Sequence, residues 1–261
     1  MAATFALRSV SLVTRRVERL LPFYRDTLGL VARRPTARTL TLHFTPEAPA
    51  VITFTENPSA REPVQRVAGL FHAALLVPDR PALAAVLARL VDHQQPLEGL
   101  SDHGVSEAIY LADPDGNGLE IYRDRPRADW PMNGEHVAMV TRALDPQGLL
   151  RDQPASPPAA PLAAATFGHI HLQVSNLAMA RKFFTTELGL AVRQEDYPGA
   201  LFFAADGYHH HVAVNTWGSP VPRGSDPLTG LAGYAAVSTR VRSPTRYLDP
   251  DGINLALDPL R

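Results

Sequence analysis

The sequence predicts an α+β fold made of four β-α-β-β-β modules, and three observations lead to this prediction. An aromatic pair followed by Leu-Gly-Leu occurs twice, 160 positions apart (183 − 23), within residues 23–30 and 183–190. The tetrapeptide Asp-Pro-Asp-Gly also occurs twice, at residues 113–116 and 249–252. Short runs of alternating apolar residues, typical of half-buried strands, lie on either side of these motifs. Similarity at a fixed spacing indicates one structural unit that the chain repeats.

The first and third modules are predicted at residues 1–60 and 166–218. Each opens with an alternating strand and continues into a helix-like stretch. That stretch ends at the Gly of Leu-Gly-Leu, because Gly readily adopts the left-handed conformation that closes many helices. A hairpin completes each module. The expected strands are residues 7–12, 39–44 and 50–55 in the first module, and residues 167–174, 200–205 and 209–215 in the third.

The second module is predicted at residues 67–124. It opens with a strand at residues 69–75, continues with a helix over residues 80–93, and closes with a hairpin. In that hairpin, residues 105–112 and 119–122 form the strands, and Asp-Pro-Asp-Gly-Asn-Gly between them supplies the turn.

The fourth module, predicted at residues 228–261, is truncated. Only 15 positions separate Tyr234 from Asp249 (249 − 234), whereas 41 separate the equivalent His72 from Asp113 (113 − 72). The difference of 26 residues (41 − 15) is enough to remove the helix and one strand.

Between the second and third modules, residues 125–165 are rich in Pro, Ala and Arg and are predicted to form a connector. Residues 135–150 are expected to contain a strand and a short helix, whereas residues 151–165 are typical of a linker. A connector of this length permits the modules on either side of it to pair with each other.

The composition excludes several classes of function. Because 25 Lys and Arg nearly balance 26 Asp and Glu, the chain offers no electrostatic attraction to nucleic acid or to an anionic membrane surface. Without Cys, disulfides and thiolate metal sites are excluded. No apolar run has the length of a signal peptide or a membrane span, which favours a cytoplasmic protein.

The ten His residues and the carboxylates are then the remaining strong ligands for a transition metal. His72 and His169 occupy equivalent positions on the opening strands of the second and third modules, and Glu120 lies in the closing strand of the second. Each alone has a simpler interpretation: a lone His on an apolar strand is usually a core residue, and a hairpin carboxylate usually faces water. Three such residues at equivalent places in related modules are not expected by chance.

These modules and residues resemble the vicinal oxygen chelate superfamily, and within it the type I extradiol ring-cleaving dioxygenases of the catechol 2,3-dioxygenase group. The resemblance covers nearly the whole chain except the connector and the truncated module. It implies the glyoxalase, bleomycin-resistance and extradiol dioxygenase fold, with one Fe(II), or alternatively Mn(II), bound by His72, Glu120 and His169. His171 competes with His169, because residues two apart share a strand face. His169 is preferred, since the family places its ligand at the start of that strand.

The ligand set also predicts how the modules pair. The equivalent opening positions of the first and fourth modules hold Ser9 and Tyr234, and the closing position of the fourth holds Ala256. If the modules paired in sequence order, His169 would lie in a different half from the other two ligands, and neither half would hold a metal well. We therefore expect the second module to pair with the third, and the first with the fourth.

The resemblance further implies an acid–base residue. The segment Gly207–Ala213 resembles a family strand with two adjacent His residues, of which the second is the acid–base catalyst, and this correspondence implies His211. His209 shares the face of His211 by alternation, whereas His210 takes the role if the opposite face points inward.

Two more residues come from the hairpin of the second module. The sequence Asp-His-Gly-Val-Ser at residues 102–106 resembles the family's Asp-His-x-Val-Ser, and Tyr110 lies ten positions before Glu120, as in the family. The resemblance implies that Tyr110 donates a hydrogen bond to the substrate oxygen at the metal. His103 lies at the entrance of a strand, and we expect it to cap or orient. A strand Tyr that merely packs its ring and exposes its hydroxyl is the alternative.

The sequence therefore predicts an Fe(II)-dependent extradiol dioxygenase that cleaves a catechol- or hydroquinone-type ring with dioxygen. Its partners would be a small aromatic diol and dioxygen, and a homo-oligomer is left open. The alternative is a metal-free or repurposed protein of the same fold that binds an aromatic compound, such as a resistance protein. The His-rich segment and Tyr110 favour catalysis, because sequestration needs no proton donor.

Overall fold

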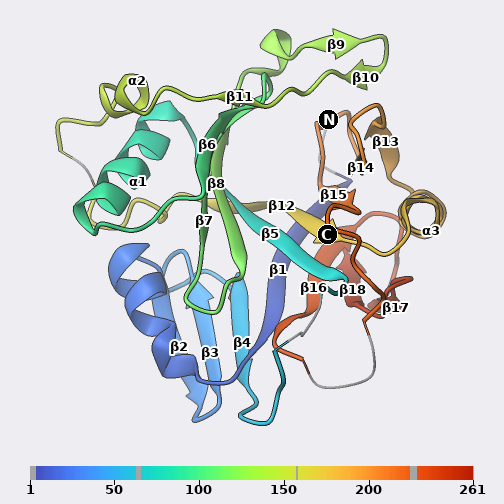
Figure 1. Ribbon diagram of the computed structural model, residues 1–261, viewed down its shortest axis with the longest axis horizontal. Coiled ribbons are helices and arrows are strands. Elements are labelled where there is room, and N and C mark those ends of the chain that lie inside the picture. Colours follow the sequence, from blue (N-terminus) through green and yellow to red (C-terminus); the bar gives the residue numbers. More distant parts are fainter. Residues whose placement is uncertain (1–3, 63–65, 157, 224–227, 261) are drawn as a thin grey trace.

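The strands of the described residues form two large curved sheets and a small ribbon (Figure 1). The computed structural model describes residues 4–62, 66–156, 158–223 and 228–260. The predicted outer ends of the first and fourth modules, Met1 and Arg261, lie outside this part of the chain. The predicted α+β class is confirmed. Among the described residues, no helix has the length and apolar character needed to cross a lipid bilayer.

The larger sheet combines the second and third modules. Over the described residues its strand order is β11-β6-β7-β8-β5-β12-β15-β14-β13. Antiparallel pairing of β5 with β12 joins the two modules at its centre, so the predicted pairing of the second and third modules is confirmed. Its strands are β5 (Gly69–Leu76), β6 (Gly99–Asp102), β7 (Ser106–Ala112), β8 (Gly118–Asp124), β11 (Arg142–Ala143), β12 (Thr166–Gln173), β13 (Ala191–Gln194), β14 (Ala200–Ala204) and β15 (Val212–Asn215).

The smaller sheet combines the first and fourth modules. Its order over the described residues is β17-β18-β16-β1-β4-β3-β2, and β1 pairs antiparallel with β16. The fourth module contributes three strands and, within residues 228–260, no helix, as the shortened sequence predicts. The strands are β1 (Phe5–Thr14), β2 (Val31–Thr36), β3 (Thr39–His43), β4 (Ile52–Glu56), β16 (Gly230–Ser238), β17 (Thr245–Leu248) and β18 (Asn254–Pro259).

The two Asp-Pro-Asp-Gly turns fold alike. Asp113 Oδ1 accepts the backbone N–H groups two and four positions later, both at 2.9 Å. Asp249 Oδ1 accepts the equivalent pair at 3.0 and 2.8 Å. The Gly of each turn is left-handed, with φ of 81° at Gly116 and 86° at Gly252. The repeat seen in the sequence is therefore a repeated hairpin turn, which connects β7 to β8 and β17 to β18.

The longest helix, α1 (Arg80–Asp92), belongs to the second module and contacts β8. Asp79 caps its N-terminus by accepting the N–H of Ala82 at 2.8 Å. Leu83 and Leu87, one turn apart, are fully buried, and each contributes about 2 kcal/mol of burial free energy. This spacing is what made the helix predictable.

The other helical segments are short. The two predicted stretches before Leu-Gly-Leu end in π-helical turns, and the chain leaves each through a left-handed glycine, Gly29 (φ 75°) or Gly189 (φ 66°). The segments are η1 (Val17–Arg19), η2 (Pro22–Thr27), η3 (Arg127–Asp129), α2 (Pro146–Leu150), α3 (Leu177–Lys182) and η4 (Phe183–Glu187).

The connector crosses the top of the view in Figure 1 and carries the ribbon formed by β9 (Met132–Asn133) and β10 (His136–Val137). The strand and short helix expected within residues 135–150 correspond to β10, β11 and α2. The predicted linker contains no helix or strand among its described residues, yet Leu162 is fully buried in the main core. The connector is thus packed against the modules that it joins.

One hydrophobic cluster is continuous between the two sheets, because β1 packs against β12. Val10 and Leu12 on β1 and Ile170 and Leu172 on β12 are all buried within it. This shared core holds β12, and the side chains on its other face, in a fixed position.

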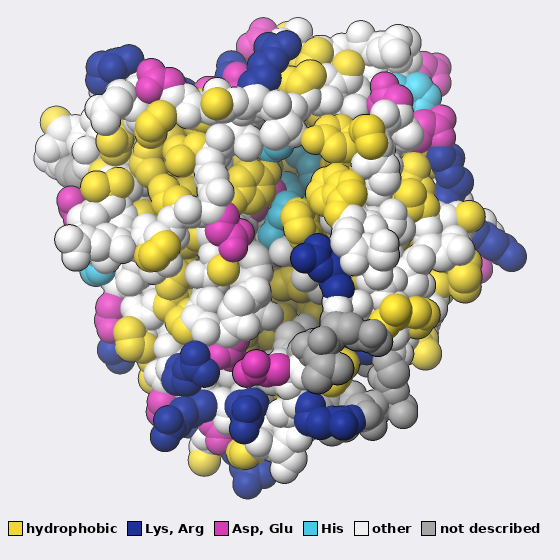
Figure 2. All heavy atoms as spheres, viewed as in Figure 1, with side chains coloured by type: hydrophobic (Ala, Val, Ile, Leu, Met, Phe, Trp, Pro, Cys, Tyr) yellow, Lys and Arg dark blue, Asp and Glu magenta, His cyan; other side chains and the backbone are white. Residues whose placement is uncertain are grey.

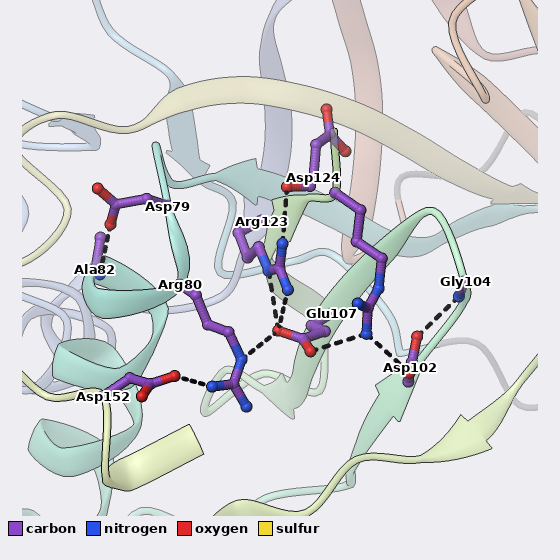
Figure 3. A network of polar contacts seen from close by, with 10 residues as sticks. Asp79, Arg80, Ala82, Asp102, Gly104, Glu107, Arg123, Asp124 and Asp152 are labelled. Atoms are coloured by element: carbon purple, nitrogen blue, oxygen red, sulfur yellow. Dashed lines mark hydrogen bonds and ion pairs between the residues drawn. The ribbon is translucent and has the colours of Figure 1, made fainter. Parts of the chain in front are cut away.

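Glu107 on β7 is a buried carboxylate held by three guanidinium groups (Figure 3). Its Oε2 accepts from Arg80 Nε at 2.9 Å and from Arg123 Nη2 at 2.7 Å, and its Oε1 accepts from Arg125 Nη2 at 3.0 Å. Arg80 also pairs with Asp152. The network joins α1, β7, β8 and the connector, and its pairing is what makes a buried charge tolerable.

We expect Glu107→Ala to destabilise the fold by about 2 to 3 kcal/mol, because three guanidinium groups lose their common partner. The partial exposure of these groups limits the loss. Urea unfolding followed by Trp fluorescence measures it. Asp258→Ala is the control, since it breaks an exposed pair with Arg246 and is expected to cost less than about 1 kcal/mol. Equal losses in the two variants would contradict the prediction.

Candidate metal centre

Three buried side chains from neighbouring strands converge at the centre of the larger sheet. His72 lies on β5, Glu120 on β8 and His169 on β12. Glu120 Oε2 is 2.9 Å from His72 Nε2 and 3.0 Å from His169 Nε2. One potential ligand atom of each residue lies within 4.8 Å of the other two. The structure therefore brings together the three residues that the sequence predicts as ligands, where the second and third modules meet.

The strand register explains this convergence. β5 is parallel to β8, which puts Ala74 opposite Glu120, and antiparallel to β12, which puts Ala74 opposite His169. Because His72 is two positions from Ala74, its side chain points to the same face. The small side chain of Ala74 leaves room for the two longer ones beside it.

Two glycines next to the ligands allow the strands to come this close. A Cβ atom at Gly168 would overlap the hydroxyl of Tyr122, and one at Gly118 would overlap the carbonyl oxygen of Phe71. Both positions therefore require glycine, and Gly168 lies at the irregularity in β12 just before His169.

The donor set fits a divalent metal ion. Two imidazole nitrogens and one carboxylate oxygen on one side of an ion form the arrangement typical of non-haem Fe(II) sites, with further positions open. Ligand atoms about 2.1 Å from one ion, at right angles, are about 3.0 Å apart, which matches both distances from Glu120 Oε2. His72 Nε2 is buried without a well-aligned hydrogen bond in the described part of the chain. An ion would satisfy that nitrogen.

The protonation of the cluster also suits a metal. Burial alone would raise the pKa of Glu120, but the neighbouring imidazoles of His169 and His72 lower this pKa well below its usual range. Burial lowers the pKa of His169. A carboxylate and a neutral imidazole are the forms that coordinate metals, so the site presents them near neutral pH.

His171, the competitor of His169, has a different partner. Asn215 Oδ1 accepts the backbone N–H of Trp217 at 3.0 Å, which turns the amide Nδ2 toward His171 Nε2 at 2.9 Å. Since the amide nitrogen only donates, His171 Nε2 accepts. Burial also lowers the pKa of His171 well below its usual value. The ring is therefore neutral, held by Asn215, and stands beside the cluster rather than in it.

A cavity of about 370 Å³ opens beside the cluster and is large enough for a small aromatic molecule. Figure 2 shows the hollow, with His side chains inside it and hydrophobic side chains around it. His72, Glu120 and His171 reach the cavity from the sheet, and His210 reaches it from the loop before β15. Its apolar and aromatic walls are formed by Phe71, Leu119, Met139, Val140, Tyr197, Phe202 and Trp217.

Tyr110 and His103 also line this cavity and form a pair. Tyr110 lies directly opposite Glu120 in the β7–β8 hairpin, so both point to one face. His103 Nδ1 donates to the carbonyl oxygen of Val140 at 2.7 Å, which leaves His103 Nε2 to accept from the Tyr110 hydroxyl at 2.8 Å. Burial and then the charge of Glu120 raise the pKa of Tyr110 well above its usual value. The hydroxyl is therefore protonated.

The turn before this pair is held by Asp102, whose Oδ1 accepts the N–H of Gly104 at 2.8 Å and whose Oδ2 accepts from Arg125 at 2.9 Å (Figure 3). The Asp of the Asp-His-Gly-Val-Ser sequence thus orients the turn, and the His beside it reaches the cavity.

The structure does not bring the predicted acid–base residue His211 to this cavity, but it does bring its neighbour His210. β15 begins only at Val212, so residues 209–211 lie in the loop before the strand, where side chains need not alternate. The ring of His211 packs against Phe5 of the smaller sheet, 5.4 Å between centroids, and burial lowers its pKa to about 4. The alternative that the sequence left open, His210, therefore replaces it as the candidate.

The ring of His210 lies 4.1 Å, between centroids, from that of His169. Burial, followed by the neighbouring imidazoles His169 and His209, lowers the pKa of His210 well below its usual value. A neutral imidazole at the wall of the cavity is in the form that accepts a proton.

Sequence reasoning did not predict the partners that hold these imidazoles. His209 Nε2 bonds Asp124 Oδ1 at 2.8 Å, and His171 bonds Asn215. Each pair joins segments far apart in the chain, so no local motif marks it. The available signal was an Asn within an apolar strand, because a buried amide requires hydrogen-bond partners.

The sheet of paired β-α-β-β-β modules and its buried cluster of two His and one Glu agree with the superfamily that the sequence resembles. The sequence model of the Glyoxalase/Bleomycin resistance protein/Dioxygenase superfamily matches residues 6–121. Catechol-2,3-dioxygenase of Bacillus subtilis (strain 168) is 41% identical over 232 residues, which cover 87% of this chain and 80% of that protein. The chain belongs to the glyoxalase/bleomycin resistance protein/dioxygenase superfamily, and the predicted resemblance is confirmed.

Solved structures show the same fold at low sequence identity. A protein of Bacillus subtilis subsp. subtilis str. 168 superposes with a TM-score of 0.64 and 14% identity, over 99% of this chain and 86% of the other. Glyoxalase I from Zea mays superposes with a TM-score of 0.58 and 14% identity, over 98% of this chain and 92% of the other. The cppA protein from Streptococcus pneumoniae TIGR4 superposes with a TM-score of 0.56 and 11% identity, over 99% of this chain and 100% of the other. At these identities the likeness concerns the fold alone.

We expect Glu120→Ala to weaken Fe(II) or Mn(II) binding by more than about 100-fold, since even residues that only support metal ligands cost about 10- to 100-fold. Anaerobic titration calorimetry of the folded variant measures this. His43→Ala is the control, because it removes a buried imidazole from β3 in the other sheet and should leave the affinity unchanged. Unaltered affinity in Glu120→Ala would exclude this residue as a ligand.

Proposed function

We propose that the protein is an Fe(II)-dependent extradiol dioxygenase that cleaves a catechol-type ring with dioxygen. The observation that carries the proposal is the buried cluster of two imidazoles and one carboxylate at the base of an aromatic-walled cavity. The enzyme class rests on the relative from Bacillus subtilis, whose name is that of a ring-cleaving dioxygenase and whose identity of 41% extends over most of the chain. Fe(II) is proposed from the donor set, with Mn(II) as the alternative ion.

When bound, the metal ion supplies Lewis acidity and a template that holds a chelating diol beside dioxygen. His72, Glu120 and His169 would hold it from one side. They leave the side that faces the cavity for the two substrates. We propose no other role for these three residues.

Tyr110 is proposed to orient the diol. Its hydroxyl is protonated and lies across the hairpin from Glu120, so it can donate to a substrate oxygen near the metal. His103 holds the hydroxyl through a hydrogen bond of 2.8 Å and is itself held by Val140. His103 is therefore proposed as an orienting residue.

His210 is proposed as the acid–base residue. Opening a catechol ring requires a base for the second hydroxyl and later an acid for the departing oxygen, and a neutral imidazole can serve as both. Among the described imidazoles that line the cavity, His72 is a candidate ligand, His171 is held by Asn215, and His103 is held between Val140 and Tyr110, so His210 remains for this role.

The walls favour an uncharged substrate. The lining combines aromatic and apolar side chains, and the described residues that form it include no Lys or Arg to pair with a substrate carboxylate. A catechol with a small apolar substituent fits these walls better than a catechol carboxylate.

A metal-free binding protein of the same fold is the alternative, and the site supports it less well. Such a protein has no use for three buried donors that converge on one point, since burying unpaired polar groups costs free energy without a ligand to recover it.

Turnover of catechol by the reconstituted protein tests the proposed function. Protein reconstituted anaerobically with Fe(II) and then supplied with catechol and dioxygen should form a yellow ring-fission product, with one dioxygen consumed per ring. Oxygen uptake and absorbance measure this together. Failure to form product by protein that binds less than stoichiometric iron would favour the metal-free alternative.

We expect His210→Phe to bind iron normally and lose turnover by about 10²- to 10⁴-fold, the usual contribution of general acid–base catalysis. His211→Phe is the matched control: it changes the next residue, whose ring packs against Phe5 away from the cavity, and should keep turnover. Steady-state kinetics with metal analysis compares the two. Loss of turnover in His211→Phe alone would restore His211 to the role.

A further inference from the structure

A chain of hydrogen bonds leads from the end of β8 into the cavity. Asp124 Oδ1 is 2.8 Å from His209 Nε2, and His209 Nδ1 is 2.8 Å from His210 Nδ1. His209 is fully buried, and His210 lines the cavity whereas the other two residues do not. The chain thus connects a carboxylate outside the cavity to an imidazole inside it.

The direction of each bond follows when the His209 ring is neutral. A carboxylate only accepts, so His209 Nε2 carries a proton and donates it to Asp124. In a neutral imidazole the other nitrogen then carries a lone pair and no proton, so His209 Nδ1 accepts from His210 Nδ1–H. His210 Nε2 is left without a proton. It is the nitrogen available to the cavity.

The chain is held rigidly at its outer end. Tyr208 donates its hydroxyl proton to Asp124 Oδ2 at 2.9 Å and accepts from Tyr122 at 2.9 Å, so each carboxylate oxygen has a donor. The ring of His209 lies 4.1 Å from that of Tyr208 and 5.2 Å from that of Trp130, between centroids. These contacts leave His209 no other orientation in which both of its bonds persist.

We propose that Asp124 and His209 are positioning residues that fix the tautomer of His210, so that His210 Nε2 faces the substrate as a base. This inference rests on the proposed function for its catalytic consequence, but not for the tautomer itself. When His210 takes a proton from the substrate hydroxyl onto Nε2, its Nδ1–H continues to donate to His209. The carboxylate of Asp124 then stabilises the resulting cation through the intervening ring.

Asp124→Asn tests the proposal. The hydroxyl of Tyr208 keeps the amide oxygen on its side, which turns the NH₂ group toward His209 Nε2 and reverses both bonds. His210 Nε2 then carries the proton. We expect kcat to fall by about 10²-fold or more, with KM and bound iron changed by less than about 3-fold.

The decisive measurement is independent of turnover. Side-chain ¹⁵N spectra of the full-length protein without added metal distinguish protonated from unprotonated ring nitrogens. We expect the proton of His210 on Nδ1 in the wild type and on Nε2 in Asp124→Asn. His209→Phe, which preserves the stacked ring but removes both bonds, should show His210 in both tautomers. Tyr208→Phe keeps the bond between Asp124 and His209 and should leave the wild-type tautomer in place.

An Nε2-protonated His210 in the wild type, or the same tautomer in the wild type and Asp124→Asn, would overturn the proposal. A tautomer that switches as expected in a protein without ring-cleaving activity would uphold the positioning role and contradict the proposed function instead. Circular dichroism of each variant confirms that the fold is retained.

Discussion

The antiparallel pairing of β5 with β12 is the interaction on which the rest of the structure depends. It joins modules that a long connector separates in the chain, and it places Ala74 opposite His169 while β8 brings Glu120 to the other side. Without this pairing Glu120 would keep His72 but lose His169, the second imidazole beside its buried carboxylate. The candidate metal centre is therefore a property of the contact between modules and belongs to neither module alone.

Much of this arrangement could be predicted from the sequence, for physical reasons. The repeated Leu-Gly-Leu and Asp-Pro-Asp-Gly motifs encode local turns, which depend on glycine and aspartate at fixed offsets. The pairing of the modules followed from the positions of His72, Glu120 and His169, because a metal site needs its ligands in one place. The acid–base residue was harder to predict. His211 was chosen from its correspondence to a family strand with two adjacent His residues, and that strand was expected to begin at residue 209. In the structure β15 begins only at Val212, and His210 lines the cavity instead.

The residues that the sequence did not reveal are those that support others. Asp124 and Asn215 each hold an imidazole from a distant strand, and such pairs depend on tertiary contacts that no local pattern records. The smaller sheet shows the opposite case. Its equivalent positions hold Ser9, Tyr234 and Ala256, which offer no comparable donor set, and the buried hydroxyl of Tyr234 has no hydrogen-bond partner in the described part of the chain. The smaller sheet contributes buried core residues, and the candidate site lies in the larger sheet.

Both sheets are closed by strands that are far apart in the chain, and this has a consequence for biosynthesis. β1 pairs with β16, so that Phe5 lies opposite Ser238, and β5 pairs with β12, which is translated much later. A nascent polypeptide that has left the ribosome only as far as β8 presents the unpaired edges of β1 and β5 and lacks the candidate ligand His169. Since unpaired edges promote association between chains, this interval is when the protein is most exposed to aggregation and chaperone capture. The candidate ligand set is complete only once the third module, which carries His169, has been translated.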